Sequence, residues 1–283
     1  MAAGAAILGA CGDEMSPTSQ PEGSSTRNAL LAAFPQGTTL VASGLATRLP
    51  YLISDAEGVP LTTIEGPVTF TVKTTDGESV GEPVEVTPRG DGIPRAYLPL
   101  TFTFPEPATY DVFAEYDGQM LDSSLAVFDR AEIKQPLPGS PLPPADTATT
   151  AQAFKVDPIC TRVPMCPFHT VNLRDALGQG KPVVVLLSTP AYCQTAVCGP
   201  ILDLLIEQAA TRTDITVIHS EVYENPKDNI ENLAKAQLAA LPKEYHMEWE
   251  PALFVTDAAN VLQARADVIV DSSEMAELLA LAK

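Results

Sequence analysis

Basic residues are scarce in this sequence. Among its 283 residues, 17 are Lys or Arg and 36 are Asp or Glu, which gives a formal net charge of −19 at pH 7. Nucleic acids and anionic membrane surfaces are bound through basic patches. The charge balance therefore argues against a nucleic acid partner and against a membrane contact made through a basic patch.

Long apolar runs are missing as well. No uninterrupted apolar segment reaches the length needed to cross a bilayer. Hydrophobic residues still make up 45% of the chain, which is enough to fill packed cores. The length favours two domains of ordinary size over one.

The N-terminus contains a short stretch of small and apolar residues that ends at Cys11. The sequence AAILGAC resembles a bacterial lipoprotein signal with Leu8-Gly9-Ala10 before the lipidated cysteine, although residues 1–10 lack the usual Lys or Arg. The resemblance implies a signal peptide remnant over residues 1–11 and a lipid anchor on Cys11. Residues 12–29 are polar and are predicted to form a disordered tether. We therefore expect an extracytoplasmic protein of the cell envelope, anchored to a membrane.

Residues 30–131 contain neither cysteine, tryptophan nor histidine, and no catalytic constellation is visible in them. Alternating apolar residues, as in residues 66–74, predict strands, and Asp-Gly and Pro-containing turns separate them. About seven strands at short spacing favour an Ig-like β-sandwich that serves as a spacer or interaction module of unknown partner. The expected strands are 38–43, 47–55, 66–74, 79–86, 95–104, 108–116 and 120–128.

Residues 132–152 are rich in proline and offer little to bury, so they are predicted to form a semi-stiff linker. From residue 153 to residue 283 the pattern changes to alternating strands and helices. The expected order is β-α-β-α-β-β-α, after a short helix that Asn172 caps. Strands are expected over residues 183–187, 214–222, 252–256 and 261–270, and helices over residues 200–211, 226–241 (stopped by Pro242) and 272–281, the last capped by Asp271 with Glu274.

Cys193 and Cys198 fall between the first of these strands and the helix that follows it. With this order, and with Pro251 in the segment WEPALFV, residues 153–283 resemble thioredoxin-like proteins. The resemblance implies a cis-proline at Pro251 that faces the cysteines and contacts a substrate peptide. It further implies thiol–disulfide exchange with protein thiols or disulfides through Cys193 and Cys198.

Four residues separate these two cysteines, whereas thioredoxins have two. Residues five apart in a continuous helix lie about 140° apart around the axis, so their side chains diverge. The two cysteines can bond only if the segment between them is a loop or a distorted turn. Gly199-Pro200 favours a helix that starts after Cys198.

A second cysteine pair, Cys160 and Cys166, precedes the first helix of this region. It could form its own disulfide or exchange electrons with Cys193 and Cys198, and the spacing from Cys166 to His169 is weakly typical of a zinc site. His219 lies within an expected strand and is interpreted as a core or interface histidine. The carboxylates of Glu221, Glu224, Glu244, Glu248 and Glu250 are interpreted as a solvated acidic rim.

Three functions fit these residues. The first is thiol–disulfide exchange, which needs no cofactor. The second is a non-catalytic binding or scaffold lipoprotein whose disulfides are structural. The third follows from a resemblance to Sco-type copper chaperones, and it would place Cu(I) on Cys193, Cys198 and His246.

Overall fold

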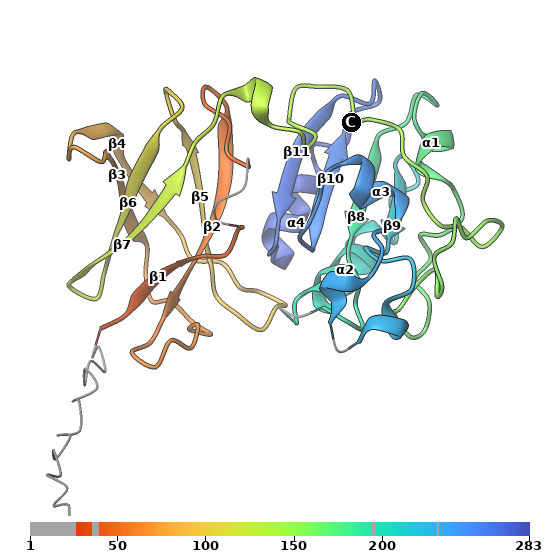
Figure 1. Cartoon of the computed structure of the whole chain (residues 1–283), viewed down its shortest axis with the longest axis horizontal. Coiled ribbons are helices and arrows are strands. Elements are labelled where there is room, and N and C mark those ends of the chain that lie inside the picture. The colour runs from red at the N-terminus through yellow and green to blue at the C-terminus, as the bar shows by residue number, and fades with distance from the viewer. Residues whose placement is uncertain (1–26, 36–39, 194–195, 231) are drawn as a thin grey trace, which may run out of the picture.

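The computed structural model describes residues 27–35, 40–193, 196–230 and 232–283. Within these ranges the protein consists mostly of β-sheets, with few helices. Figure 1 shows two parts side by side: strands β1 to β7 form one, and a sheet flanked by helices forms the other. Cys11 and nearly all of the expected tether lie outside the described residues.

The first part is a sandwich of two antiparallel sheets. One has the strand order β1-β2-β5 and the other β4-β3-β6-β7. Their inward side chains, among them Tyr51, Phe70 and Phe104, form one continuous core. The strands are β1 (Ala29–Ala32), β2 (Ala46–Ser54), β3 (Val68–Thr74), β4 (Ser79–Val86), β5 (Leu98–Thr103), β6 (Thr109–Tyr116) and β7 (Gln119–Ala126).

One predicted strand of the sandwich is wrong. Residues 40–43, the described part of the expected strand 38–43, form only an isolated bridge from Ala42 to Phe128. The first strand in the described residues is β1, where no strand was expected. It pairs antiparallel with β2. Leu40 and Val41 are nevertheless buried, so their apolar character reflects core packing and not a place in a sheet.

The second part is built on a four-stranded sheet with the order β11-β10-β8-β9. Its strands are β8 (Val183–Leu187), β9 (Thr216–Ser220), β10 (Ala252–Thr256) and β11 (Leu262–Asp267). Strand β8 pairs parallel with β9 and antiparallel with β10, and all five of its residues are buried. A strand buried on both faces has a continuous apolar sequence, which is why this one was predictable.

Helices cover both faces of this sheet. Helices α2 (Cys198–Ala209) and α4 (Ser272–Leu279) pack on one face. Helices α1 (Leu173–Ala176) and α3 (Ala240–Glu244) pack on the other. The predicted caps are confirmed, since the Asn172 side chain accepts from Arg174 N and that of Asp271 accepts from Glu274 N. No helix in the described residues is long and apolar enough to cross a membrane.

The helix predicted over residues 226–241 is wrong. The chain there forms two 3₁₀ turns, η2 (Pro226–Asn229) and η3 (Leu233–Lys235), and then α3. Tyr223 forms a bridge with Leu238, and Ala239 N donates to Val222 O, so the chain doubles back and cannot continue as a helix. Pro242 lies in the first turn of α3, where a missing N–H costs no helical bond.

The expected linker is packed against the second part. Leu142, Ala145 and Ala148 are buried, although the sequence suggested that this stretch has almost nothing to bury. Gly139 N donates to Leu262 O, and Pro141 forms a bridge with Val261. From η1 (Arg130–Glu132) to α1, the chain is therefore an irregular strap. It lies along β11 and packs on the face of the sheet that α1 and α3 cover.

A buried polar junction joins the two parts. Arg48 of β2 pairs with Glu274 of α4 at 2.5 Å, and both side chains are about nine-tenths buried. Tyr97 donates to the same carboxylate at 2.5 Å and accepts from Asp271 N at 2.9 Å. Figure 1 shows β2 and β5 facing β11 and α4 across this junction. Each of these buried charges therefore has a partner from the other part, which offsets the cost of burying it.

Candidate functional site

Cys193 and Cys198 form a disulfide between β8 and α2, with their Cα atoms 6.0 Å apart. Cys198 is the first residue of α2 and is fully buried, whereas Cys193 is half-buried in the preceding loop. The helix therefore starts at Cys198 itself and not after it. Ala196 has φ +60°, which shows how the loop bends to bring the two sulfurs together.

Pro251 follows a cis peptide bond and immediately precedes β10, as the resemblance implied. Its carbonyl accepts from Val268 N at 2.7 Å, which ties this loop to the end of β11. Trp249 packs beside the loop, and its indole Nε1 donates to Asp267 Oδ1 at 3.1 Å. This supports a packing role for Trp249.

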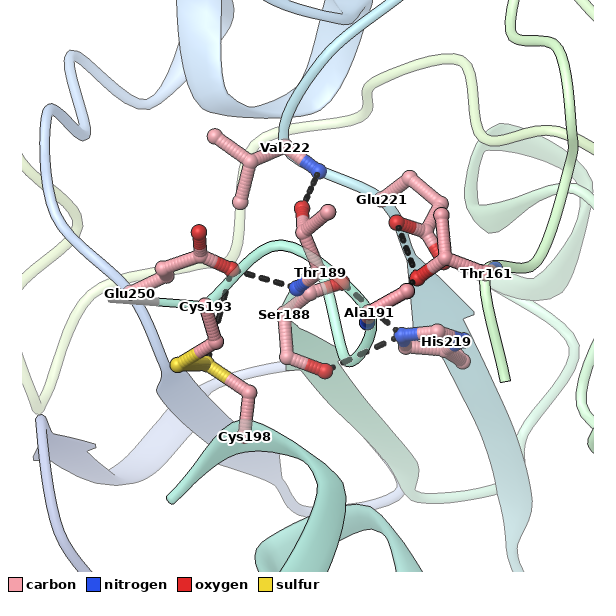
Figure 2. The surroundings of a disulfide bond; sticks show 10 residues. All are labelled: Thr161, Ser188, Thr189, Ala191, Cys193, Cys198, His219, Glu221, Val222 and Glu250. Atoms are coloured by element: carbon pink, nitrogen blue, oxygen red, sulfur yellow. Dashed lines mark hydrogen bonds between the residues drawn. A yellow bond between two sulfur atoms is a disulfide. The ribbon is translucent and has the colours of Figure 1, made fainter. Parts of the chain in front are cut away.

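The Glu250 carboxylate lies against the disulfide (Figure 2). Its Oε2 accepts from Thr189 N and lies 3.6 Å from Cys198 Sγ. Burial raises the pKa of Glu250 to about 7, although hydrogen bonds from Thr189 oppose the rise. The expectation that Glu250 belongs to a solvated rim is wrong, because the loop turns its side chain inward.

Glu221 is also buried, which corrects the same expectation. Its carboxylate accepts from Thr161 N at 2.6 Å and from Thr161 Oγ1 at 3.2 Å. Burial raises the pKa of this carboxyl well above its ordinary value. Glu221 therefore holds the loop that carries Cys160.

Cys160 and Cys166 are buried and are not bonded to each other. Their sulfurs lie 3.8 Å and 3.5 Å from Nδ1 of His219. A hydrogen bond from Cys166 lowers the pKa of Cys160, and the same contact raises the pKa of Cys166. The pair thus forms no disulfide in this structure, and two histidines lie beside it.

Two backbone carbonyls orient the imidazoles beside these sulfurs. His219 Nε2 lies 3.0 Å from Ser188 O, and His169 Nδ1 lies 3.2 Å from Ala148 O. A carbonyl can only accept, so these ring nitrogens carry the protons. The other nitrogens, His219 Nδ1 and His169 Nε2, face each other at 3.2 Å. His219 is buried as expected, but it belongs to a polar cluster and not to an apolar core.

The turn at Ser188 and Thr189 lies between the disulfide and this cluster. Ser188 Oγ lies 3.0 Å from His219 Nε2, while Thr189 N donates to Glu250. Figure 2 shows the disulfide and Glu250 on one side of the turn, with His219 and Glu221 on the other. Both groups of residues therefore depend on the conformation of the same turn at the end of β8.

The residues proposed for copper do not come together. His246 is exposed, and its backbone carbonyl accepts from Gln135. Within the described part of the chain, the single group of three or more side chains that could hold a metal consists of Cys160, Cys166, His169 and His219. The structure thus moves the candidate metal ligands from Cys193, Cys198 and His246 to the other cysteine pair.

No family model and no curated protein matches this chain. Among solved structures, it is similar to a thioredoxin-family thiol:disulfide interchange protein from Chlorobium tepidum, at 14% identity over 52% of this chain and 97% of that one, with a TM-score of 0.33. It is also similar to the Lin-41 filamin domain, at 14% identity over 36% of this chain and 91% of that one, with a TM-score of 0.25. A tandem of titin Ig domains matches at 13% identity over 36% of this chain and 49% of that one, with a TM-score of 0.23.

The strand orders show an Ig-like sandwich followed by a thioredoxin-like α/β sheet. In the latter, a disulfide joins the end of the central strand to the first helix, and a cis-proline precedes the antiparallel strand β10.

Proposed function

We propose that this protein carries out thiol–disulfide exchange through Cys193 and Cys198. The observation that carries the proposal is the disulfide itself, which joins a half-buried cysteine to a fully buried one with a carboxylate beside the buried sulfur. A purely structural disulfide needs no such carboxylate. The Cα separation of 6.0 Å shows that the four-residue gap still permits a bond between the two cysteines.

Cys193 is the attacking cysteine, because it is the more accessible of the two. In the reduced protein, its thiolate attacks one sulfur of a substrate disulfide. A mixed disulfide forms, and the other substrate sulfur leaves as a thiolate. Cys198 is unsuited to this step because its side chain is fully buried beneath the loop.

Cys198 completes the exchange. Its thiol gives its proton to Glu250 Oε2, and the resulting thiolate attacks Cys193 Sγ in the mixed disulfide. The second substrate thiolate leaves, and the Cys193–Cys198 disulfide re-forms. A carboxylate with a pKa near 7 is suited to this transfer, because it can take up and release a proton near neutral pH. A dithiol donor returns the protein to its reduced form, and the same steps in reverse oxidise a substrate dithiol.

Pro251 is proposed to contact the substrate chain. It connects Glu250 to β10, so it lies within the same loop as the carboxylate beside Cys198. Proline has no backbone N–H, so Pro251 presents no donor of its own to a substrate backbone that passes here. The role rests on the resemblance to thioredoxin-like proteins and on this placement.

We further propose that the protein acts outside the cytoplasm, anchored to a membrane by a lipid on Cys11. The sequence pattern ending at Cys11 supports this proposal. A stable disulfide in the second part is in keeping with an oxidising compartment. Mass spectrometry of the native N-terminus tests the anchor, and an unmodified Cys11 would end this part of the proposal.

The test of exchange traps the intermediate. Reduced Cys198→Ser protein is mixed with a fluorescent peptide disulfide, and adducts are located by mass spectrometry. We expect a stable mixed disulfide on Cys193. The reciprocal variant, Cys193→Ser, is expected to form no adduct, because its remaining Cys198 is buried.

A reduction potential complements the trap. Structural disulfides have potentials below about −300 mV, whereas catalytic ones are more oxidising. A potential below this value in the wild-type protein, with no adduct in Cys198→Ser, would favour a binding or scaffold protein over an exchange enzyme. Circular dichroism of both variants confirms that a missing adduct does not reflect unfolding.

A further inference from the structure

The four side chains around His219 form a site that thiol exchange does not use. Cys160 Sγ, Cys166 Sγ, His169 Nε2 and His219 Nδ1 all lie within 4.8 Å of one another, and all four residues are buried. We propose that this cluster is a structural zinc site with two cysteine and two histidine ligands.

The distances in the cluster match a tetrahedron around zinc. Zn–S bonds of about 2.3 Å and Zn–N bonds of about 2.05 Å in tetrahedral geometry place two nitrogens about 3.4 Å apart, and a sulfur and a nitrogen about 3.6 Å apart. The corresponding distances here are 3.2 Å between the two nitrogens, and 3.5 Å and 3.8 Å from the sulfurs to His219 Nδ1. These three distances fit one ion at the centre, and the other three lie within the 4.8 Å that bounds the cluster.

The tautomers of the two histidines support the same conclusion. The carbonyls of Ser188 and Ala148 keep the protons on His219 Nε2 and His169 Nδ1. The two nitrogens that face each other therefore present lone pairs, which repel unless a proton or a cation lies between them. Metal-bound histidines commonly donate their other N–H to a backbone carbonyl or carboxylate, as both do here.

The charge and coordination number select zinc. Two thiolates and two neutral imidazoles neutralise a divalent cation, which removes the cost of burying charge. Two sulfurs and two nitrogens in a tetrahedron are the donor set of structural zinc sites, which leave no open coordination position. Such a site has no room for a substrate, so its role is to hold the fold.

The position of the ligands shows what zinc would hold. Cys160, Cys166 and His169 belong to the irregular strap between η1 and α1, whereas His219 belongs to β9. A long segment without regular structure costs conformational entropy to fix, and backbone bonds such as His219 N to Phe168 O are few. A zinc ion would bind this strap to the edge strand of the sheet.

The test begins with the full chain, purified without chelator and kept reduced under nitrogen. Metal content by mass spectrometry is expected to give one zinc per chain. Cobalt added to the zinc-free protein is expected to give visible bands of a tetrahedral ion and a thiolate-to-cobalt charge-transfer band in the near ultraviolet. Zinc should abolish both by displacing the cobalt.

Matched variants locate the site. Cys166→Ser and His219→Gln are expected to weaken cobalt binding by more than the roughly 10- to 100-fold that loss of an outer-shell partner causes. The double variant Cys193→Ser/Cys198→Ser and the variant His246→Gln change the same residue types outside the cluster, and they should keep one equivalent. If Cys166→Ser does not fold, alkylation of the wild-type protein replaces it, and zinc should protect Cys160 and Cys166 but not Cys193.

Several results would overturn the proposal. They are a reduced protein that binds no zinc, stoichiometric copper in place of zinc, a cobalt spectrum that survives Cys166→Ser, and a zinc content that falls in Cys193→Ser/Cys198→Ser. None of these measurements depends on exchange at Cys193, so the two proposals fail separately.

Discussion

The two cysteine pairs lie on opposite sides of one turn, yet their surroundings are unlike. Cys193 and Cys198 are bonded, and a carboxylate lies beside them. Cys160 and Cys166 are unbonded, and two imidazoles lie beside them. A carboxylate can move a proton to and from a thiol, whereas neutral imidazoles can share a metal ion with thiolates. The neighbours of the cysteines, more than the cysteines themselves, determine which chemistry each pair supports.

Accessibility separates the pairs in the same way. Cys193 is half-buried at the surface of a loop, where a protein disulfide can reach it. Cys160 and Cys166 are 8% and 1% exposed, so only an ion or a small molecule can reach their sulfurs. Changing one pair and measuring at the other tests whether the two pairs act separately.

The largest effect is expected from removing the metal. At free zinc a thousandfold above its dissociation constant, binding adds about 4 kcal/mol to the free energy of unfolding. For a protein of this size, chelation should then lower the Tm of the reduced protein by about 10 °C. Differential scanning calorimetry with and without chelator measures this fall in Tm. The control variant His246→Gln should show the same fall as the wild-type protein. A Tm that ignores the chelator would contradict the zinc site.

Replacing the carboxylate should affect exchange only. Glu250→Gln removes the proton acceptor of Cys198, so release of the second substrate thiol at pH 7 should slow by about 10²-fold. In the wild-type protein this rate should rise with pH up to about 7 and then level off, because the pKa of Glu250 is about 7.

Single-turnover kinetics between pH 5 and pH 9 measure this rate. The exposed neighbour Glu248→Gln is the matched control and should keep the wild-type profile. The cobalt spectrum should be the same in all three proteins. If the rising limb persists in Glu250→Gln, another group accepts the proton.

In the zinc-loaded protein, reductant should act only on the bonded pair, Cys193 and Cys198. Reducing the Cys193–Cys198 disulfide opens a loop with a sequence separation of 5. Loop entropy for such a short loop predicts a loss of about 2 kcal/mol in the free energy of unfolding. Urea unfolding of the zinc-loaded protein with and without reductant measures the loss, and Cys193→Ser/Cys198→Ser should show none. A reductant-dependent loss in that double variant would place the labile bond elsewhere.

Stability should also depend on pH through Glu250. Its pKa rises from 4.5 in the unfolded chain to about 7 in the folded protein, because burial disfavours the carboxylate. Between these values the folded state binds the extra proton, so the free energy of unfolding falls as pH rises from 4.5 through 7. With allowance for partial exposure, Glu250→Gln should be about 1–2 kcal/mol more stable than wild type at pH 8 and equal to it at pH 4.5.

Other titrating groups face Glu250 and stay in both proteins. Burial raises the pKa of Glu221 and of Tyr223, and Cys198 does not titrate while it is bonded. The charge of Glu250 also raises the pKa of both neighbours, so the difference between the two proteins reports Glu250 together with its effect on them. Thermal unfolding at pH 4.5, 6 and 8 measures the difference in free energy of unfolding between the two proteins. If this difference does not change with pH, the pKa of Glu250 is not raised by folding.

The smallest effect is expected at the shared turn. Ser188→Ala removes the hydroxyl beside His219 Nε2 but keeps the backbone carbonyl of Ser188 at 3.0 Å. Cobalt affinity should fall by less than about 10-fold, the lower limit for losing a whole outer-shell partner. A larger loss would show that the hydroxyl, and not the carbonyl, fixes the tautomer of His219.

Much of the second part could be predicted from sequence because its signals are local. The apolar run of β8, the Asn172 and Asp271 caps and the proline before β10 each act within a few residues. The failures come from long-range pairing. The bridge from Tyr223 to Leu238 overrides the helical pattern between them, and no local pattern announces it.

The candidate site divides in the same manner. The cis-proline was expected only through the resemblance to thioredoxin-like proteins. The bond between Cys193 and Cys198 stayed open, because four intervening residues permit it only in a loop or a distorted turn. Glu250 was missed because a carboxylate in a polar loop gives no sign of which way it turns. His219 was missed because 53 residues separate it from Cys166, and only the parallel pairing of β8 with β9 brings it beside the strap.

The junction of Arg48, Tyr97 and Glu274 also bears on how such a protein can be divided. Asp271 caps α4 while accepting from Gly90 and Asp91 of the sandwich, so the last helix borrows donors from the other part. A gene fragment cut at the proline-rich strap would uncover Arg48 and Tyr97 in one product and Glu274 in the other, and would remove the two donors that Asp271 accepts from. Dividing the chain there would therefore break an interface that belongs to both folds, and each product would expose polar groups that now pair with the other.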